Sequence, residues 1–271
     1  MTSDKRLGLI LPSFNDIRIG QAIESIRRFD DANCVKLFVI DGGSSPEVCD
    51  IIRPLIREGD VFIHERDRGI FDALNKGLEL CDTEFIGWLG SDDLFTGQVP
   101  SSEVLKSLAE NDLFVANLAI FSDGRVRRLT HAWPSAMGLV RFGLHNPHYA
   151  TFGRADLFKS ERFSLQLMGA DIAYFIRLFA RKPRVDWTSC VGTLQCAGGF
   201  SNASCSRTWH INWQLLQIYG AATHPVIAPF AVLVKIGYKI WSSMYYMLFK
   251  LESMGLEVQR PSAEYIDKSP S

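Results

Sequence analysis

The chain lacks several features that would each point to a particular class of protein. Its 29 basic and 30 acidic side chains nearly cancel, and a net charge of -1 gives no general attraction to nucleic acid. The six cysteines form no C-x-x-C pair, and several lie in apolar segments, which favours reduced thiols. No secretory signal precedes the first apolar run. We therefore expect a cytoplasmic protein that does not bind nucleic acid.

The sequence also lacks the motifs of two common kinds of cofactor site. No G-x-G-x-x-G pattern follows the first expected strand, which disfavours a dinucleotide-dependent oxidoreductase. A zinc site is conceivable, but the spacing of its candidate ligands matches no usual structural zinc motif. Those candidates are Cys190, Cys196, Cys205 and His210.

The first half of the chain alternates between strand and helix patterns. Apolar runs predict buried strands at 7–11, 35–40, 61–64 and 84–89. Amphipathic segments between them predict helices at about 19–26, 46–57 and 69–80. This alternation predicts an α/β fold in which helices flank a mostly parallel central sheet. Later in the chain we expect helices at 101–110 and 169–181, and strands at 113–121, 125–130 and 184–187.

The segment 226–250 differs from the rest of the chain. It carries Lys235, Lys239 and Lys250, no acidic residue and many apolar side chains. The lysines interrupt it too often for a transmembrane span. As a helix it would have a polar stripe opposite a wide apolar face, which suits a helix lying on an anionic membrane. A helix packed on its own domain or on another subunit fits equally well, so a homo-oligomer is also open.

Polar residues follow each of the four expected strands in the first half. Ligands of open parallel sheets bind outside the carboxyl ends of the strands, so these residues are candidates for a binding site. Asp41 could accept hydrogen bonds from a base or ribose, or it could simply form a turn. Asp92 and Asp93 are adjacent and point in different directions, so one could bind a hard cation while the other contacts a polar ligand. The residues after the first strand are Pro12, Ser13 and Asn15.

Three motifs occur in the order seen in family 2 glycosyltransferases. They are Asp41-Gly42-Gly43-Ser44, the segment from Asp67 to Gly77 (DRGIFDALNKG), and Ser91-Asp92-Asp93. Over roughly residues 7–200 the chain resembles bacterial members that build cell-surface polysaccharides. The resemblance implies the GT-A fold for residues 1–221, with a nucleotide-binding half to about 97 and an acceptor-binding half at 98–221. An amphipathic helical extension at 222–259 and a flexible tail at 260–271 would follow.

The resemblance also implies roles for the motif residues. Asp92 would contact the ribose, and Asp93 would bind a divalent cation, Mn²⁺ or Mg²⁺, that bridges the diphosphate. Ser91 stands where many relatives carry an acid, so water could replace one metal ligand. The nucleotide contacts would be Pro12, Ser13, Asn15, Asp41, Asp67, Lys76 and Asp92.

The family places its catalytic base at the start of a helix that faces the acceptor. Asp171 is the acid at that place here, with a plain helix cap as the alternative. His148 lies where relatives often show His-Gln, and it could line the site or be structural. Further residues on the acceptor or donor-sugar side would be Asp72, Ser91, Gly199 and Arg207.

These features together predict an inverting, metal-dependent glycosyltransferase. It would move a sugar from a nucleotide-diphosphate donor, with UDP as the expected nucleotide, to a hydroxyl of a saccharide or lipid-linked acceptor. Its place would be the cytoplasm or the inner face of the cell membrane, in polysaccharide biosynthesis. A non-catalytic sugar-nucleotide-binding relative is the alternative. A nucleotidyltransferase would need a glycine-rich loop with a basic residue, which residues 11–16 lack.

Overall fold

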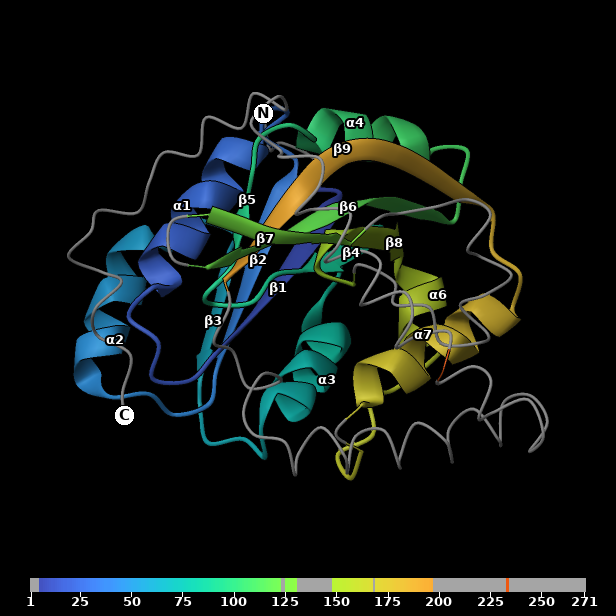
Figure 1. Cartoon of the computed structure of the whole chain (residues 1–271). Helices are drawn as coiled ribbons and strands as arrows, with labels where there is room; N and C mark the ends of the chain where they lie inside the picture. Colours follow the sequence, from blue (N-terminus) through green and yellow to red (C-terminus); the bar gives the residue numbers. More distant parts are fainter. Residues whose placement is uncertain (1–4, 123–124, 131–147, 168, 197–232, 234–271) are drawn as a thin grey trace.

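The structure is a computed structural model that describes residues 5–122, 125–130, 148–167, 169–196 and 233 (Figure 1). Its strands are β1 (Leu7–Ser13), β2 (Val35–Asp41), β3 (Val61–His64), β4 (Phe85–Trp88), β5 (Leu94–Phe95), β6 (Leu113–Ser122), β7 (Arg125–Thr130), β8 (Thr151–Arg154) and β9 (Val185–Cys196). Its helices are α1 (Ile19–Phe29), α2 (Pro46–Ile52), α3 (Ile70–Leu80), α4 (Ser101–Leu108), α6 (Ala155–Lys159) and α7 (Ala170–Ala180), with 3₁₀ turns η1 (Arg53–Leu55) and η3 (His148–Ala150).

The strands form one sheet in the order β3-β2-β1-β4-β8-β6-β9-β5, and β7 pairs with β6. The first four strands in this order are all parallel, as the alternation of strand and helix patterns predicts. The remaining part is mixed: β8 runs antiparallel to both of its neighbours, whereas β6 and β9 are parallel. The chain order reverses between β1 and β4, which is where an open α/β sheet has its ligand crevice.

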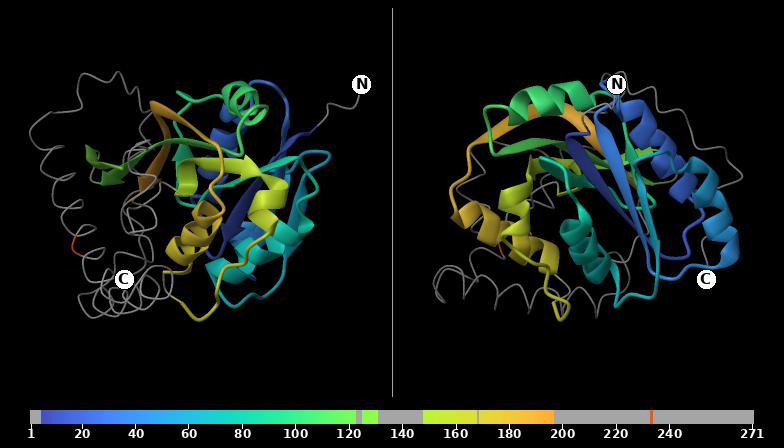
Figure 2. Two further views of the ribbon diagram at one scale, coloured as in Figure 1. Left: turned by 90° about the vertical axis from the view of Figure 1, so that its right-hand side faces the viewer. Right: turned by 180° about the vertical axis from the view of Figure 1, so that it is seen from behind.

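Each face of the sheet carries its own hydrophobic core, because side chains alternate along the strands. In β1, Leu9 and Leu11 belong to the core that includes residues of α1, α2 and α4. Ile10 belongs to the other core, which includes residues of α3, α6 and α7. Figures 1 and 2 show these helices arranged on the two sides of the sheet. Strands β1, β2 and β4 are thus largely buried on both faces, which explains their nearly continuous apolar sequences, whereas the edge strand β3 is only partly buried.

Five elements differ from the sequence prediction. The helix expected at 46–57 ends at Ile52 and continues as η1. Pro54 is the reason, since it has no N–H to donate to the carbonyl of Asp50. The strand expected at 184–187 extends to Cys196 because it pairs with β6 and β5. Strands β5 and β8 and helix α6 were not predicted.

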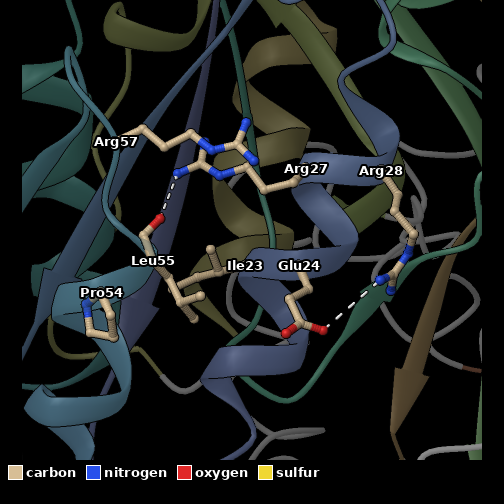
Figure 3. Close-up of a pocket in the computed structure, with 7 residues that line it drawn as sticks. All are labelled: Ile23, Glu24, Arg27, Arg28, Pro54, Leu55 and Arg57. Carbon is tan, nitrogen blue, oxygen red and sulfur yellow. Dashed lines mark hydrogen bonds and ion pairs between the residues drawn. The ribbon is translucent and has the colours of Figure 1, made fainter.

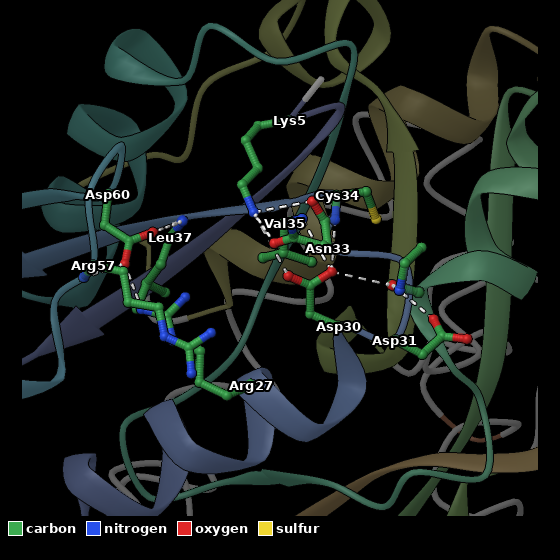
Figure 4. Close-up of polar contacts among 12 residues, drawn as sticks. Lys5, Arg27, Asp30, Asp31, Asn33, Cys34, Val35, Leu37, Arg57 and Asp60 are labelled. Carbon is green, nitrogen blue, oxygen red and sulfur yellow. Dashed lines mark hydrogen bonds and ion pairs between the residues drawn. The ribbon is translucent and has the colours of Figure 1, made fainter. Parts of the chain in front are cut away.

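Polar contacts fix the connections at the amino ends of β2 and β3 (Figure 4). Asp30 ends the α1 turn and accepts the backbone N–H groups of Cys34 and Val35 at 2.8 and 3.2 Å. Asp60 accepts the N–H of Leu37 at 2.9 Å and also pairs with Arg27 of α1. These side chains accept backbone N–H groups at the start of β2 and so hold α1 and β2 in place. They lie at the amino ends of the strands, away from the carboxyl ends.

Within the described residues, no helix is long and apolar enough to cross a membrane. The extension expected at 222–259 and the tail at 260–271 lie outside the described residues.

The glycines at the two ends of the 69–77 motif have backbone roles. Gly69 precedes α3 with φ at 106°, a conformation that suits glycine. Gly77 lies against β1, where an added Cβ would come within 2.3 Å of Ile10 Cγ2. The second glycine of this motif therefore allows α3 to pack closely on the sheet.

Gly77→Ala should destabilise the fold by about 1–3 kcal/mol, because the new methyl group overlaps the buried side chain of Ile10. Gly20→Ala in α1 is the matched control. Its Cβ first meets Ile51 at 3.1 Å, and a gain in helix propensity of about 1 kcal/mol offsets this contact. Urea unfolding measures both changes, and equal stability of the two variants would contradict the close packing of α3 on β1.

Candidate active site

The carboxyl ends of the parallel strands gather the predicted polar residues at one edge of the sheet. Ser13 ends β1 directly beside Asp41, which ends β2. Asp41 in turn lies beside His64, the last residue of β3. The acid pair Asp92-Asp93 follows β4, the other neighbour of β1. The sheet register therefore places residues from four strand ends at one edge of the sheet, where open α/β sheets have their ligand crevice.

The two acids after β4 lie over the backbone of Gly90. A Cβ at Gly90 would be 2.7 Å from Oδ2 of Asp93 and 3.0 Å from Oδ1 of Asp92, so glycine leaves room for both carboxylates. Asp93 is only 1% exposed, and its Oδ1 accepts the backbone N–H of Cys196 at 3.1 Å. Cys196 ends β9, so a strand from the second half of the chain closes this corner.

The acid pair carries more negative charge than its described surroundings neutralise. Burial raises the pKa of Asp93 well above its usual value, and the charge of Asp92 raises it further. Burial also raises the pKa of Asp92, although Arg18 opposes that shift. Close carboxylate oxygens with unfavourable charge are the donors that Mg²⁺ or Mn²⁺ prefers. The residues present therefore fit the divalent cation that the sequence motif implies.

Arg18 and Asp16 form a charged pair beside these acids that the sequence did not single out. The Nη2 of Arg18 lies 2.7 Å from Oδ2 of Asp16 and 3.5 Å from Oδ2 of Asp92. The backbone N–H of Arg18 also donates to Asp16 at 2.9 Å, which holds the turn before α1. The hydrogen bond to Asp16 raises the pKa of Arg18, so this guanidinium remains a fixed positive charge at the crevice.

Asp171 lies in the first turn of α7, the start of the helix expected there. Its Oδ2 is 3.8 Å from Nδ1 of His148 in η3. The ring centroid of His148 lies 4.2 Å from that of Tyr149. Desolvation of its hydroxyl raises the pKa of Tyr149 well above the usual value, and the charges of Asp93, Asp92 and Asp171 add to the shift. Tyr149 therefore lies within electrostatic reach of all three acids.

Asp41 is more deeply buried than a simple turn residue would be. Its side chain is fully buried, and it accepts the N–H groups of Ser44 and Gly43 at 2.9 and 3.2 Å. The hydroxyl of Ser44 donates to its other oxygen, and Nδ1 of His64 lies 2.6 Å from Oδ2. Burial alone would raise the pKa of Asp41, but these hydrogen bonds, led by Ser44, lower it. Asp41 is therefore held as a carboxylate.

The loops after β1 and β2 are tied to each other around Asp41. The N–H of Asn15 donates to the hydroxyl of Ser44 at 2.8 Å, and Asn15 Oδ1 accepts the N–H of Ser45 at 2.9 Å. Pro12 is buried within β1, and no described residue donates to or accepts from the buried hydroxyl of Ser13. These hydrogen bonds tie the two loops together beside the buried Ser13 hydroxyl.

The loop before α3 completes this side of the crevice. Asp67 accepts the N–H of Gly69 at 2.8 Å, and its carboxylate packs against the Cα of Gly42. Asp72 is nearly buried and pairs with Arg68 at 3.0 Å, and this contact lowers the pKa of Asp72. Lys76 pairs with Glu65 at 2.7 Å. Asp72 and Lys76 therefore hold the loop in place.

One predicted site residue makes no distinctive contact, and others lie outside the residues that the structure describes. Ser91 is half-buried in the turn before the acid pair. Gly199 and Arg207 lie outside the described residues, as do Cys205 and His210 of the conceivable zinc site. Sequence reasoning missed Asp16, Arg18 and His64. It had named Cys196 only for that zinc site, although Cys196 ends β9 and its N–H donates to Asp93, and no local pattern signals this contact.

A pocket elsewhere on the surface is unrelated to these residues (Figure 3). It is lined by Ile23, Glu24, Arg27, Arg28, Pro54, Leu55 and Arg57. Two of its three cations have partners inside the pocket: Arg27 donates to the carbonyl of Leu55 at 3.1 Å, and Arg28 lies 4.0 Å from Glu24. None of the predicted site residues lines this pocket.

The family described as Glycosyl transferase family 2 matches residues 9–177, more than half of the chain. Two curated relatives, each named "PGL/p-HBAD biosynthesis glycosyltransferase", come from Mycobacterium tuberculosis (strain H37Ra) and Mycobacterium bovis (strain BCG). Both are 28% identical over 156 residues, covering 55% of this chain and 59% of the relative. The chain therefore spans about three fifths of the length of these relatives.

Two solved structures share the fold. Staphylococcus aureus TarS in complex with UDP-GlcNAc has a TM-score of 0.63 and 14% identity, covering 96% of this chain and 78% of that one. The mannosyltransferase PcManGT from Pyrobaculum calidifontis, in complex with GDP-Man and Mn²⁺, has a TM-score of 0.59 and 14% identity, with coverage of 91% and 79%. At this identity the likeness concerns the fold, and it confirms the predicted GT-A architecture.

Asp93→Asn and Asp41→Asn should change stability in opposite directions in the presence of a chelator. The pKa of Asp93 is raised in the fold, so its ionised form destabilises the protein at neutral pH, and Asn should raise Tm. The pKa of Asp41 is lowered, so its stabilisation is present above the unfolded pKa and is lost as pH falls through the folded value.

Asp41→Asn should therefore lower Tm at pH 7 by an amount equivalent to about 1–3 kcal/mol, and this loss should vanish in acid. Differential scanning calorimetry across pH measures both variants, with roughly 2–4 °C expected for each kcal/mol. A lower Tm for Asp93→Asn without metal would show that the acid pair is already neutralised by the protein.

Proposed function

Because the chain belongs to glycosyltransferase family 2, we propose that it transfers a sugar from a nucleotide-diphosphate donor to an acceptor hydroxyl, with inversion at the anomeric carbon. The observation that carries this proposal is an acid pair between β4 and β5 that includes the buried Asp93, together with a separate acid, Asp171, in the first turn of α7. An acid pair suited to a diphosphate and a separate acid for the acceptor are the two groups that such a transfer needs. A mere sugar-nucleotide-binding protein would have no use for the second.

Donor binding is proposed along the strand ends. Asp41, the Ser13 hydroxyl and the loops that carry Asn15 and Asp67 would contact the nucleoside, and Asp92 the ribose. We favour a UDP-sugar, since TarS, a structural neighbour, binds UDP-GlcNAc. The neighbour that binds GDP-Man shows that this fold also accepts a purine nucleotide, so the donor is tested with both.

The diphosphate is proposed to lie over the acid pair. Asp93, supported by Asp92, would hold a divalent cation, which as a Lewis acid offsets the charge that grows on the leaving nucleotide. Mn²⁺ accompanies GDP-Man in one neighbour, which supports a metal of this kind. Arg18 adds a fixed positive charge 3.5 Å from Asp92, and it would attract the diphosphate while Asp16 prevents its guanidinium from turning away.

Asp171 is proposed as the general base. It would take the proton of the acceptor hydroxyl as that oxygen attacks the anomeric carbon from the face opposite the leaving nucleotide. A well-placed base contributes typically about 10²–10⁴-fold to the rate. His148, whose Nδ1 lies 3.8 Å from Oδ2 of Asp171, would orient the Asp171 carboxylate.

Asp171→Asn should lower transfer by about 10²–10⁴-fold and leave the affinity for UDP unchanged, because Asp171 faces the acceptor rather than the nucleotide. Asp156→Asn is the matched control: Asp156 also stands in the first turn of a helix, but its side chain is 82% exposed. Release of UDP or GDP from a panel of nucleotide sugars with Mn²⁺ measures turnover, and calorimetry with UDP and GDP measures binding.

Wild-type turnover in Asp171→Asn would remove Asp171 from the mechanism. Binding of UDP without turnover of any donor, by the wild type as well as the variant, would favour the non-catalytic alternative. Tight binding of GDP but not of UDP would show that the donor is a GDP-sugar and that the proposal of UDP is wrong.

The acceptor is proposed to be lipid-linked or a saccharide at a membrane surface, in polysaccharide biosynthesis. The support is the composition of 226–250, whose lysines and apolar residues suit an anionic bilayer. The full chain should float with vesicles that contain phosphatidylserine, and less with neutral vesicles. Changing both Lys235 and Lys239 to Gln should weaken binding by about 2 kcal/mol, or about 30-fold. Equal flotation with neutral vesicles, or none at all, would overturn the membrane proposal.

A further inference from the structure

Three side chains of different chemistry converge beside the proposed nucleoside contact. Asp41 ends β2, Cys49 lies in α2 and His64 ends β3. One carboxylate oxygen, the thiol sulfur and one imidazole nitrogen of these residues all lie within 4.8 Å of one another. The ladder between β2 and β3 pairs Asp41 with His64, and α2 packs its buried Cys49 over them.

The thiol and the carboxylate approach the same nitrogen of His64. Sγ of Cys49 is 3.4 Å from Nδ1, and Oδ2 of Asp41 is 2.6 Å from that same Nδ1. A Cys-His-Asp nucleophile relay would use the two ring nitrogens separately, one for the thiol and one for the carboxylate. This geometry therefore rules out a relay, whereas a shared metal ion requires donors that converge on one point.

We propose that Asp41, Cys49 and His64 form an inhibitory site for Zn²⁺. Sulfur, nitrogen and oxygen donors are the set that zinc binds, whereas Mg²⁺ and Mn²⁺ prefer oxygen alone. The site is thus chemically distinct from the acid pair at Asp93.

One donor distance already matches a tetrahedral zinc centre, and a second would have to lengthen. With zinc bonds of about 2.0 Å to nitrogen and about 2.3 Å to sulfur, the two donors would lie about 3.5 Å apart. The observed Cys49–His64 distance is 3.4 Å. The Asp41–His64 hydrogen bond of 2.6 Å would lengthen by about 0.7 Å as the metal replaces its proton. His64 can allow this movement because its side chain is 43% exposed.

The exposed side of His64 also gives the metal a route from solvent and leaves the fourth ligand position open to water. A zinc ion held there would occupy Asp41 and fix His64 at the wall of the crevice. This part of the inference rests on the proposed function: zinc would then compete with the nucleoside of the donor, while the diphosphate corner stayed unchanged.

The test is zinc binding by the purified full chain, first stripped of metal, in competition with a chromophoric chelator and without nucleotide. We expect one tight zinc site in the wild type. Cys49→Ser and His64→Gln should each weaken it at least tenfold. The control Cys190→Ser removes a partly exposed thiol outside the cluster and should bind zinc as the wild type does. With Co²⁺ as the probe, thiolate-to-metal absorbance should be lost in Cys49→Ser alone.

Zinc binding that survives both Cys49→Ser and His64→Gln, or that Cys190→Ser abolishes, would overturn the site. UDP calorimetry with Mn²⁺ then tests inhibition: added zinc should weaken UDP binding by the wild type and have no effect on Cys49→Ser. Unchanged UDP affinity in zinc-loaded wild type would overturn the inhibitory role. Failure of the zinc-free wild type to bind any nucleotide would count against the proposed function and leave the zinc titration valid.

Discussion

The parallel pairing of β3, β2, β1 and β4 is the constraint on which the candidate site depends. Backbone hydrogen bonds fix Ser13 beside Asp41 and Asp41 beside His64, whatever the loops beyond them do. Both faces of these strands are covered by apolar cores, so the register cannot slip without moving buried side chains to the wrong face. The paired strands therefore provide a fixed frame, and the candidate functional residues lie at and just beyond the strand ends.

Two buried aspartates at this edge are in opposite electrostatic states. Asp41 has hydrogen bonds to both oxygens, and its pKa is lowered, so it helps to hold the loops together as a carboxylate. Asp93 has one backbone donor and a charged neighbour, and its pKa is raised. The first arrangement stabilises the metal-free protein, whereas the second stores unfavourable charge that a cation can relieve. The same residue type, aspartate, thus stabilises the loops at Asp41 and provides unneutralised negative charge at Asp93.

The sequence prediction was accurate for elements that local interactions specify and poor for elements that depend on distant parts of the chain. In the first half, helices and strands were predicted well because each is specified by its own apolar periodicity, and the main error was the end of α2 at Pro54. In the second half, β9 was predicted far too short, since β6 and β5 set its length from distant parts of the chain. Strand β8 likewise exists only through its pairing with β4 and β6.

The sequence by itself determined the fold class, the family and the order of polar residues after the strands, because local periodicity and motif spacing carry that information. It also identified Asp41, Asp93 and Asp171 as candidates. Only the tertiary structure decided their neighbours: Arg18 beside Asp92, Cys196 against Asp93, Tyr149 near three acids, and Cys49 with His64 beside Asp41. These contacts join segments far apart in the chain, and proximity of that kind arises from packing across the sheet.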